Sequence, residues 1–190
     1  MLFHYDFSSP YAYLAAHRIG ALLPAARWQP IAFGPLVLEI GKVPWSWDEG
    51  PDRTARMEDC ERRAAALGLP LRWPPGWPKA TYSIAVLRAA LVAEDHGLLR
   101  DFSLAAFDAG LGHGRDLSDL AVVLEVAEAV GLPPAAVEAG VADPVVKARL
   151  RAATDAAIAR GVTGIPTVVV GEQLFWGDDR LEEAAAAALA

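Results

Sequence analysis

The chain has 190 residues, 54% of them hydrophobic, and a formal net charge of −7, which suits one domain with a real core and excludes global disorder. Without a basic stripe, nucleic acid and anionic membranes are poor candidates for partners. A single cysteine excludes an internal disulfide or dithiol pair. The sequence shows neither a secretory signal nor an apolar stretch long enough to span a bilayer, so we expect a cytoplasmic protein.

The first elements along the chain are a predicted strand, helix and strand. Residues 2–7 alternate aromatic side chains with smaller or polar ones, which is typical of a two-faced strand. Residues 11–23 are predicted to be helical, and residues 27–34 form a second strand. Two strands joined through a helix form a βαβ unit, so we expect them to run parallel.

The middle of the chain is predicted to be almost entirely helical, after an irregular segment over residues 35–52. The predicted helices cover 52–67, 81–97, 98–112, 118–130, 134–140 and 144–160. Cys60 falls on an apolar stripe of the first of these helices, which favours a packing role over a nucleophilic one.

The last segment returns to β-structure. Residues 165–171 are short and β-branched, as in a buried strand, and residues 174–176 complete a hairpin. Asp178 or Asp179 is then expected to cap a closing helix.

The order βαβ, helical block, ββα predicts an α/β, thioredoxin-like fold with a large all-helical insertion, of the DsbA-like type. The thioredoxin-like domain would comprise residues 1–36 and 160–190, and the insertion residues 37–159. Fold alone does not give an activity.

Ser8, Ser9 and Pro10 stand where the first helix begins. A serine cap followed by proline is an ordinary helix start. A helix N-terminus also offers free N–H groups and a positive dipole end, which stabilise an anion such as a thiolate, and a serine hydroxyl adds one more donor. Both interpretations stay open at this stage.

Two further stretches carry candidate binding residues. In "GVTGIPT", over residues 161–167, proline before a buried strand suggests a cis bond after Ile165, whose backbone could then pair with an extended peptide. In "FWGDDR", over residues 175–180, an aspartate beside free N–H groups could recognise a ligand that carries both an ammonium and a carboxylate.

The remaining candidates are less specific. The Pro-rich loops contain four tryptophans, which could cover the core or form the wall of an aromatic pocket: Trp45, Trp47, Trp73 and Trp77. The four histidines lack metal-ligand spacing, so no metal site is expected.

Three stretches together resemble one family, the 2-hydroxychromene-2-carboxylate isomerases: "DFSSPYAYLA", "RGVTGIPTVVVGEQLFWGDDRLEEA" and the helical block between them. These enzymes are similar to kappa-class glutathione transferases and to the DsbA-like branch of the thioredoxin superfamily. The disulfide oxidoreductases of that branch have Cys-x-x-Cys where residues 9–12 here contain no cysteine.

The resemblance implies glutathione as cofactor and Ser9, rather than Ser8, as the residue that activates its thiol. It implies that the Ile165 and Pro166 backbone pairs with glutathione and that Asp178 and Asp179 hold the γ-glutamyl end. The implied reaction is a cis–trans isomerisation of 2-hydroxychromene-2-carboxylate to a hydroxybenzylidenepyruvate in aromatic catabolism.

The resemblance also suggests a homodimer and a small aromatic carboxylate as substrate. Tyr11, Lys42 and Trp45 are the candidate substrate contacts. Relatives often have Gly-Asn where this chain has Gly41 and Lys42, whose ammonium could pair with the substrate carboxylate. The alternatives are a kappa-like transferase or peroxidase and a glutathione- or peptide-binding protein without catalysis.

Overall fold

The structure, a computed structural model, describes residues 1–78 and 82–189. Within these residues four strands form one mixed sheet in the order β2-β1-β3-β4. The strands are β1 (Leu2–Tyr5), β2 (Arg27–Pro30), β3 (Thr167–Val170) and β4 (Gln173–Trp176). β1 runs parallel to β2 and antiparallel to β3, which forms a hairpin with β4. The predicted βαβ unit and terminal hairpin are therefore confirmed.

The helices follow the expected order around this sheet, and short 3₁₀ turns occupy Trp45–Trp47 and Asp178–Arg180. The helices are α1 (Pro10–Leu22), α2 (Phe33–Glu39), α3 (Pro51–Ala66), α4 (Ile84–Asp95), α5 (Leu99–Phe107), α6 (Leu120–Ala129), α7 (Pro134–Ala142), α8 (Pro144–Ala159) and α9 (Leu181–Ala188).

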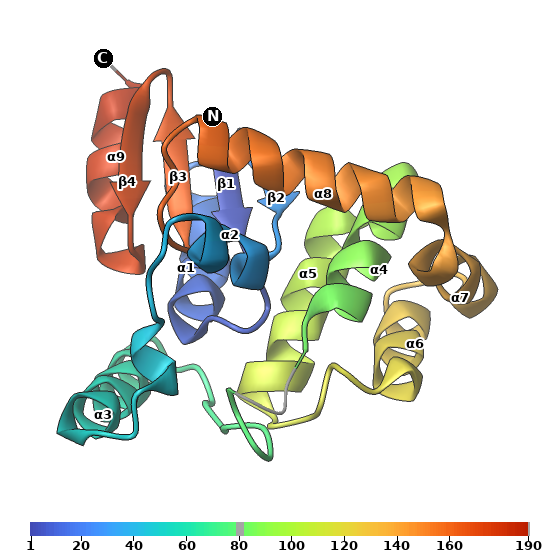
Figure 1. The fold of residues 1–190 in the computed structure, drawn as a ribbon, viewed down its shortest axis with the longest axis horizontal. Helices are drawn as coiled ribbons and strands as arrows, with labels where there is room; N and C mark the ends of the chain where they lie inside the picture. The colour runs from blue at the N-terminus through green and yellow to red at the C-terminus, as the bar shows by residue number, and fades with distance from the viewer. Residues whose placement is uncertain (79–81, 190) are drawn as a thin grey trace.

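The sheet separates two layers of helices. Aromatic side chains of β1 pack with residues of α1, α4 and α9 in the main core; the rings of Phe3 and Trp28 lie 5.0 Å apart, edge to face. On the opposite face, Val37 of α2 and Ala157 of α8 pack with Val169 of β3. In Figure 1, α8 crosses above α2 and β2, α4 to α7 gather on one side, and α3 lies apart below the sheet.

Two of the predicted boundaries are wrong in the first half of the chain. Residues 31–34 do not continue the second strand, and the segment predicted to be irregular contains α2, which begins at Phe33. Pro35 lies in the first turn, where a missing N–H does no harm, and Leu36 and Val37 are buried. This short helix is stabilised by tertiary contacts with α8 rather than by its own sequence. A segment of seven residues is too short to show a clear helical pattern in the sequence.

The helix predicted over residues 98–112 is also interrupted. α5 ends at Phe107, and Asp108–Gly112 form a π-helical turn. The helix predicted to begin at residue 81 begins at Ile84; residue 81 itself lies outside the described residues. In the part of the chain that the structure describes, no helix is both long enough and apolar enough to cross a bilayer.

Candidate active site

Ser9 ends the turn that joins β1 to α1. Its backbone N–H donates to the Asp6 carbonyl at 3.2 Å, and its hydroxyl oxygen accepts from the Ala12 N–H at 3.2 Å. Pro10 follows in the first helical turn. The predicted serine cap is therefore confirmed. The side chain of Ser9 is largely buried, so a ligand atom must come into close contact with the turn to reach its hydroxyl.

The segment before β3 meets this turn from the other end of the chain. The Ile165-Pro166 bond is cis, as predicted. The Ser9 hydroxyl donates to the Ile165 carbonyl at 3.5 Å, a long and weak hydrogen bond. The fold thus places Ser9 between the N-terminus of α1 and the backbone of residues 165 and 166.

The two neighbouring aspartates have different surroundings. Asp178 is buried; its carboxylate accepts from the Arg63 guanidinium at 2.7 Å, with Arg18 3.8 Å away. Burial raises the pKa of Asp178 to about 6, and Arg63 opposes that shift. Asp179 is exposed. Of the two, Asp179 has the carboxylate that a ligand ammonium can reach.

The prediction that one aspartate caps the last helix is wrong. A 3₁₀ turn comes first, so α9 begins only at Leu181 and Arg180 takes the cap position, with no side-chain cap. Gly177 makes the turn possible because its φ of 115° lies in a region that side chains disfavour.

Two of the three candidate substrate contacts lie together. The rings of Tyr11 and Trp45 are 6.0 Å apart, and Trp45 lies 5.8 Å from Trp77. Lys42 does not join them: its Nζ lies 5.7 Å from the ring centroid of the exposed Trp176. The structure therefore brings Tyr11 and Trp45 into one aromatic wall, with Trp77 as a third member, and separates Lys42 from it.

Helix α3 supplies cationic residues that the sequence interpretation missed. The guanidinium carbons of Arg53, Arg56 and Arg63 lie 5.9, 5.8 and 5.7 Å from the rings of Trp77, Trp45 and Tyr11, respectively. Arginines repeated at helical spacing on the face that contains an apolar stripe were the available signal. The aromatic wall is therefore bordered by positive charge, which suits an anionic aromatic ligand.

Cys60 lies on the same face of α3 and is buried, so the predicted packing role is confirmed. Burial raises the pKa of its thiol to about 12, although a hydrogen bond from the Tyr11 hydroxyl opposes the shift. A thiol that stays protonated at neutral pH is a poor nucleophile.

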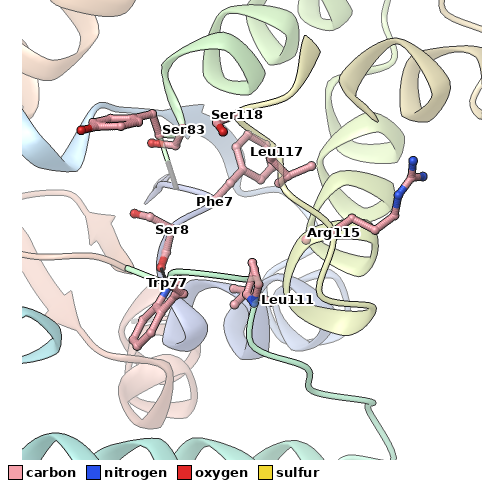
Figure 2. Close-up of a pocket in the computed structure, with 11 residues that line it drawn as sticks. Phe7, Ser8, Trp77, Ser83, Leu111, Arg115, Leu117 and Ser118 are labelled. Atoms are coloured by element: carbon pink, nitrogen blue, oxygen red, sulfur yellow. Dashed lines mark hydrogen bonds between the residues drawn. The ribbon is translucent and has the colours of Figure 1, made fainter. Parts of the chain in front are cut away.

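Figure 2 shows a pocket beside the turn that ends at Ser9. Its walls are mainly apolar and include Phe7, Trp77, Leu111 and Leu117. The indole N–H of Trp77 donates to the Ser8 carbonyl at 3.1 Å, which ties the pocket wall to the turn. The figure shows Arg115 extending away from the cavity, where it pairs with Glu125. The cavity is lined by Ser8 rather than Ser9, and its free space holds about one water molecule.

None of the four histidines, all of which the structure describes, lines the pocket in Figure 2. His4 is buried, its two ring nitrogens have no hydrogen-bond partner, and burial lowers its pKa to about 4. Over residues 1–78 and 82–189, no group of three or more His, Cys, Asp or Glu side chains is arranged to hold a metal ion.

Comparison with known proteins agrees with this fold. The family model of the DsbA-like thioredoxin domain matches residues 1–188. A 2-hydroxychromene-2-carboxylate isomerase of Sphingobium xenophagum is 32% identical over 95% of this chain and 93% of its own. A second, from Pseudomonas sp. (strain C18), is 28% identical over 94% of this chain and 85% of its own.

A solved structure of a 2-hydroxychromene-2-carboxylate isomerase superposes with a TM-score of 0.88 at 26% identity, covering 98% of this chain and 94% of that one. The match extends over both the sheet and the helical block. The chain therefore belongs to the DsbA-like thioredoxin family and, within it, to the family of the 2-hydroxychromene-2-carboxylate isomerases.

Proposed function

We propose that the protein is a glutathione-dependent isomerase of 2-hydroxychromene-2-carboxylate or a related aromatic carboxylate. The names of its relatives supply the reaction class. The observation that carries the glutathione part is the position of Ser9 at the start of α1, beside residues 165 and 166. Since residues 9–12 contain no cysteine, a sulfur nucleophile at this place would come from a ligand.

Ser9 would act as a hydrogen-bond donor to the glutathione sulfur. A free thiol titrates at about pH 8.5, so it is mostly protonated at neutral pH. The positive dipole end at the start of α1 and a serine hydroxyl both favour the thiolate. The present bond from Ser9 to the Ile165 carbonyl is long, so redirecting the hydroxyl to sulfur costs little.

The remaining parts of glutathione would bind to residues 165, 166 and 179. The backbone of Ile165 and Pro166 would pair with the peptide, and Asp179 would hold the γ-glutamyl ammonium. Asp178, paired with Arg63, would fix the shape of that end of the site. When bound, glutathione would supply a thiolate that adds reversibly to the conjugated double bond of the substrate, so that this bond can rotate.

The substrate would lie against the aromatic wall. Tyr11 and Trp45 offer ring faces, and the positive charge of α3 complements the substrate carboxylate. Lys42 stays a proposed carboxylate partner, although it lies over Trp176 in the ligand-free chain.

The test measures glutathione binding by calorimetry at millimolar concentration, then turnover of 2-hydroxychromene-2-carboxylate with and without glutathione. S-Methylglutathione is the matched control, because it keeps the peptide and γ-glutamyl groups but lacks the thiol. We expect binding of both compounds and turnover with glutathione alone. No binding of glutathione would contradict the proposal.

The same preparation separates the alternatives. Faster turnover in an aromatic transferase or peroxide assay than in the isomerase assay would indicate the kappa-like activity. Glutathione binding without any turnover would indicate a binding protein.

We also propose a cytoplasmic homodimer. Leu38 and Val43, at and after the end of α2, are 80% and 77% exposed, and contiguous exposed apolar surface marks sites of protein–protein contact. Light scattering that gives the mass of one chain would contradict the dimer.

A further inference from the structure

A second cleft lies at the far end of α1 from Ser9. It opens to solvent between the connection from α1 to β2 and the turn from α4 to α5, with a free volume of about 310 Å³. Pockets that hold small ligands begin at about 300 Å³. The helix between the two places has 13 residues and a length of about 20 Å, so this cleft is separate from the site proposed for glutathione.

Part of the cleft wall is apolar and rigid. Leu23, Trp28 and Leu99 line it, and the first two are almost fully buried. The indole of Trp28 is held in the core by edge-to-face contacts with Phe3 and Tyr5, at ring distances of 5.0 and 5.5 Å. The wall therefore offers a fixed apolar surface against which a small ring can pack.

Two arginines and one glutamate provide the charge of this cleft. Among the residues that the structure describes, neither Arg27 nor Arg100 has a side-chain hydrogen bond or an ion pair. Glu94 also lines the cleft, but its carboxylate already accepts from Arg149 at 3.1 Å. The cleft thus has two uncompensated positive charges in a protein whose net charge is −7, and this excess suits an anionic ligand.

The position of Arg100 depends on Gly20. A Cβ atom at Gly20 would clash with Nη2 of Arg100, so the guanidinium lies directly against the backbone of α1. Glycine is unfavourable inside a helix, and Gly20 has no positive φ that would require it. A cation near a helix C-terminus ordinarily donates to the last carbonyls, yet Arg100 makes no such bond to the described residues. Its packing on Gly20 leaves its N–H groups available to a ligand.

We propose that this cleft is a second binding site, which takes a small aromatic carboxylate. The carboxylate would accept from Arg27 and Arg100, since a guanidinium binds a carboxylate through paired N–H donors. The ring would pack against Trp28 and Leu99. A carboxylate suits the cleft better than a phosphate dianion, because Glu94 lies in the same wall and repels each further negative charge. The site involves no sulfur and does not depend on the isomerase function.

The test is a titration of the whole chain with benzoate, followed by NMR through the backbone amide signals of Gly20 and Gly97, which both line the cleft. We expect saturable shifts of both signals, and none with neutral benzyl alcohol. Arg27→Gln and Arg100→Gln should each weaken benzoate binding about tenfold, because each loses a charged hydrogen bond. Arg151→Gln is the matched control, since it removes the same charge from a side chain that is 84% exposed on α8, and it should leave the affinity unchanged.

Gly20→Ala keeps every charge and tests the geometry. Alanine favours the helix, so the variant should be at least as stable as wild type, while its methyl group displaces the Arg100 guanidinium. Benzoate binding should therefore weaken about three- to tenfold without loss of the fold. Wild-type affinity in Gly20→Ala or Arg100→Gln would overturn the proposal. Shifts confined to the signals of Tyr11 and Trp45 would overturn it too, because benzoate would then bind only at the aromatic wall.

Discussion

The hydroxyl of Ser9 lies 3.5 Å from the carbonyl oxygen of Ile165, although the two residues are separated by 156 positions in the chain. The contact brings the start of α1 and the end of the loop before β3 to one point. A hydroxyl that only capped its helix would need no partner in that loop. The position of Ser9 suits both a cap and a donor to a ligand bound along residues 165 and 166.

Ser9→Ala should separate these two roles. Loss of the cap should reduce the free energy of unfolding by about 1 kcal/mol. Loss of a donor to a charged sulfur should lower kcat by about ten- to a hundredfold. The matched control is Asp143→Ala, which removes the cap of α8, where the carboxylate accepts from the Val145 N–H at 2.7 Å. Urea unfolding and isomerase turnover check both variants; equal turnover in the two would leave Ser9 as a cap only.

Trp45→Leu should weaken substrate binding. The substitution removes a ring that lies 6.0 Å from Tyr11 and faces Arg56, so we expect KM for the aromatic substrate to rise about five- to tenfold, with little change in glutathione affinity. Trp47→Leu is the control from the same 3₁₀ turn, because Trp47 is 51% exposed. An identical KM in both variants would place the substrate elsewhere.

Asp178→Asn should stabilise the protein at neutral pH. The pKa of Asp178 is about 6 in the fold against 3.8 for the ordinary group, so the folded state prefers the protonated form. This preference stabilises the fold at low pH and is lost as the pH rises through about 6. Asparagine lacks the charge, so the variant should gain about 1–3 kcal/mol near pH 7 and almost nothing near pH 4.

Urea unfolding over this pH range provides the measurement for Asp178→Asn. Asp179→Asn is the control, and its exposed side chain should change the free energy of unfolding by less than about 0.5 kcal/mol. A variant that is less stable than wild type at neutral pH would show that the ion pair with Arg63 outweighs the cost of burial.

His4→Leu should remove an opposite pH effect. The pKa of His4 falls from 6.5 to about 4 on folding, so the folded state prefers the neutral imidazole. The stability that depends on the neutral form is complete above pH 6.5 and is lost as the pH falls towards 4. The two ring nitrogens are also buried without partners, which costs about 1–3 kcal/mol at any pH. Leucine should therefore stabilise the fold at neutral pH and more so in acid. A variant with the acid sensitivity of wild type would contradict this role for His4.

Local signals made much of the site predictable from the sequence. A serine and a proline define the start of α1, and the proline before a β-branched strand indicated the cis bond. Helix α2 was missed because its stability comes from packing against α8. The prediction that Asp178 caps the last helix was wrong because its carboxylate accepts a hydrogen bond from Arg63, which lies far away in the sequence. Asp6 read as one face of a strand, since nothing local shows that the N–H of Phe33 donates to its carboxylate.

The most direct test of the account is the pKa of the glutathione thiol in the complex, measured by ultraviolet difference absorbance of the thiolate across a pH titration. With the wild-type chain we predict a thiol pKa at least about one unit below that of free glutathione, and with Ser9→Ala a value closer to the free one. A bound thiol that titrates like free glutathione in the wild-type chain would contradict the central claim that Ser9 and the start of α1 activate it.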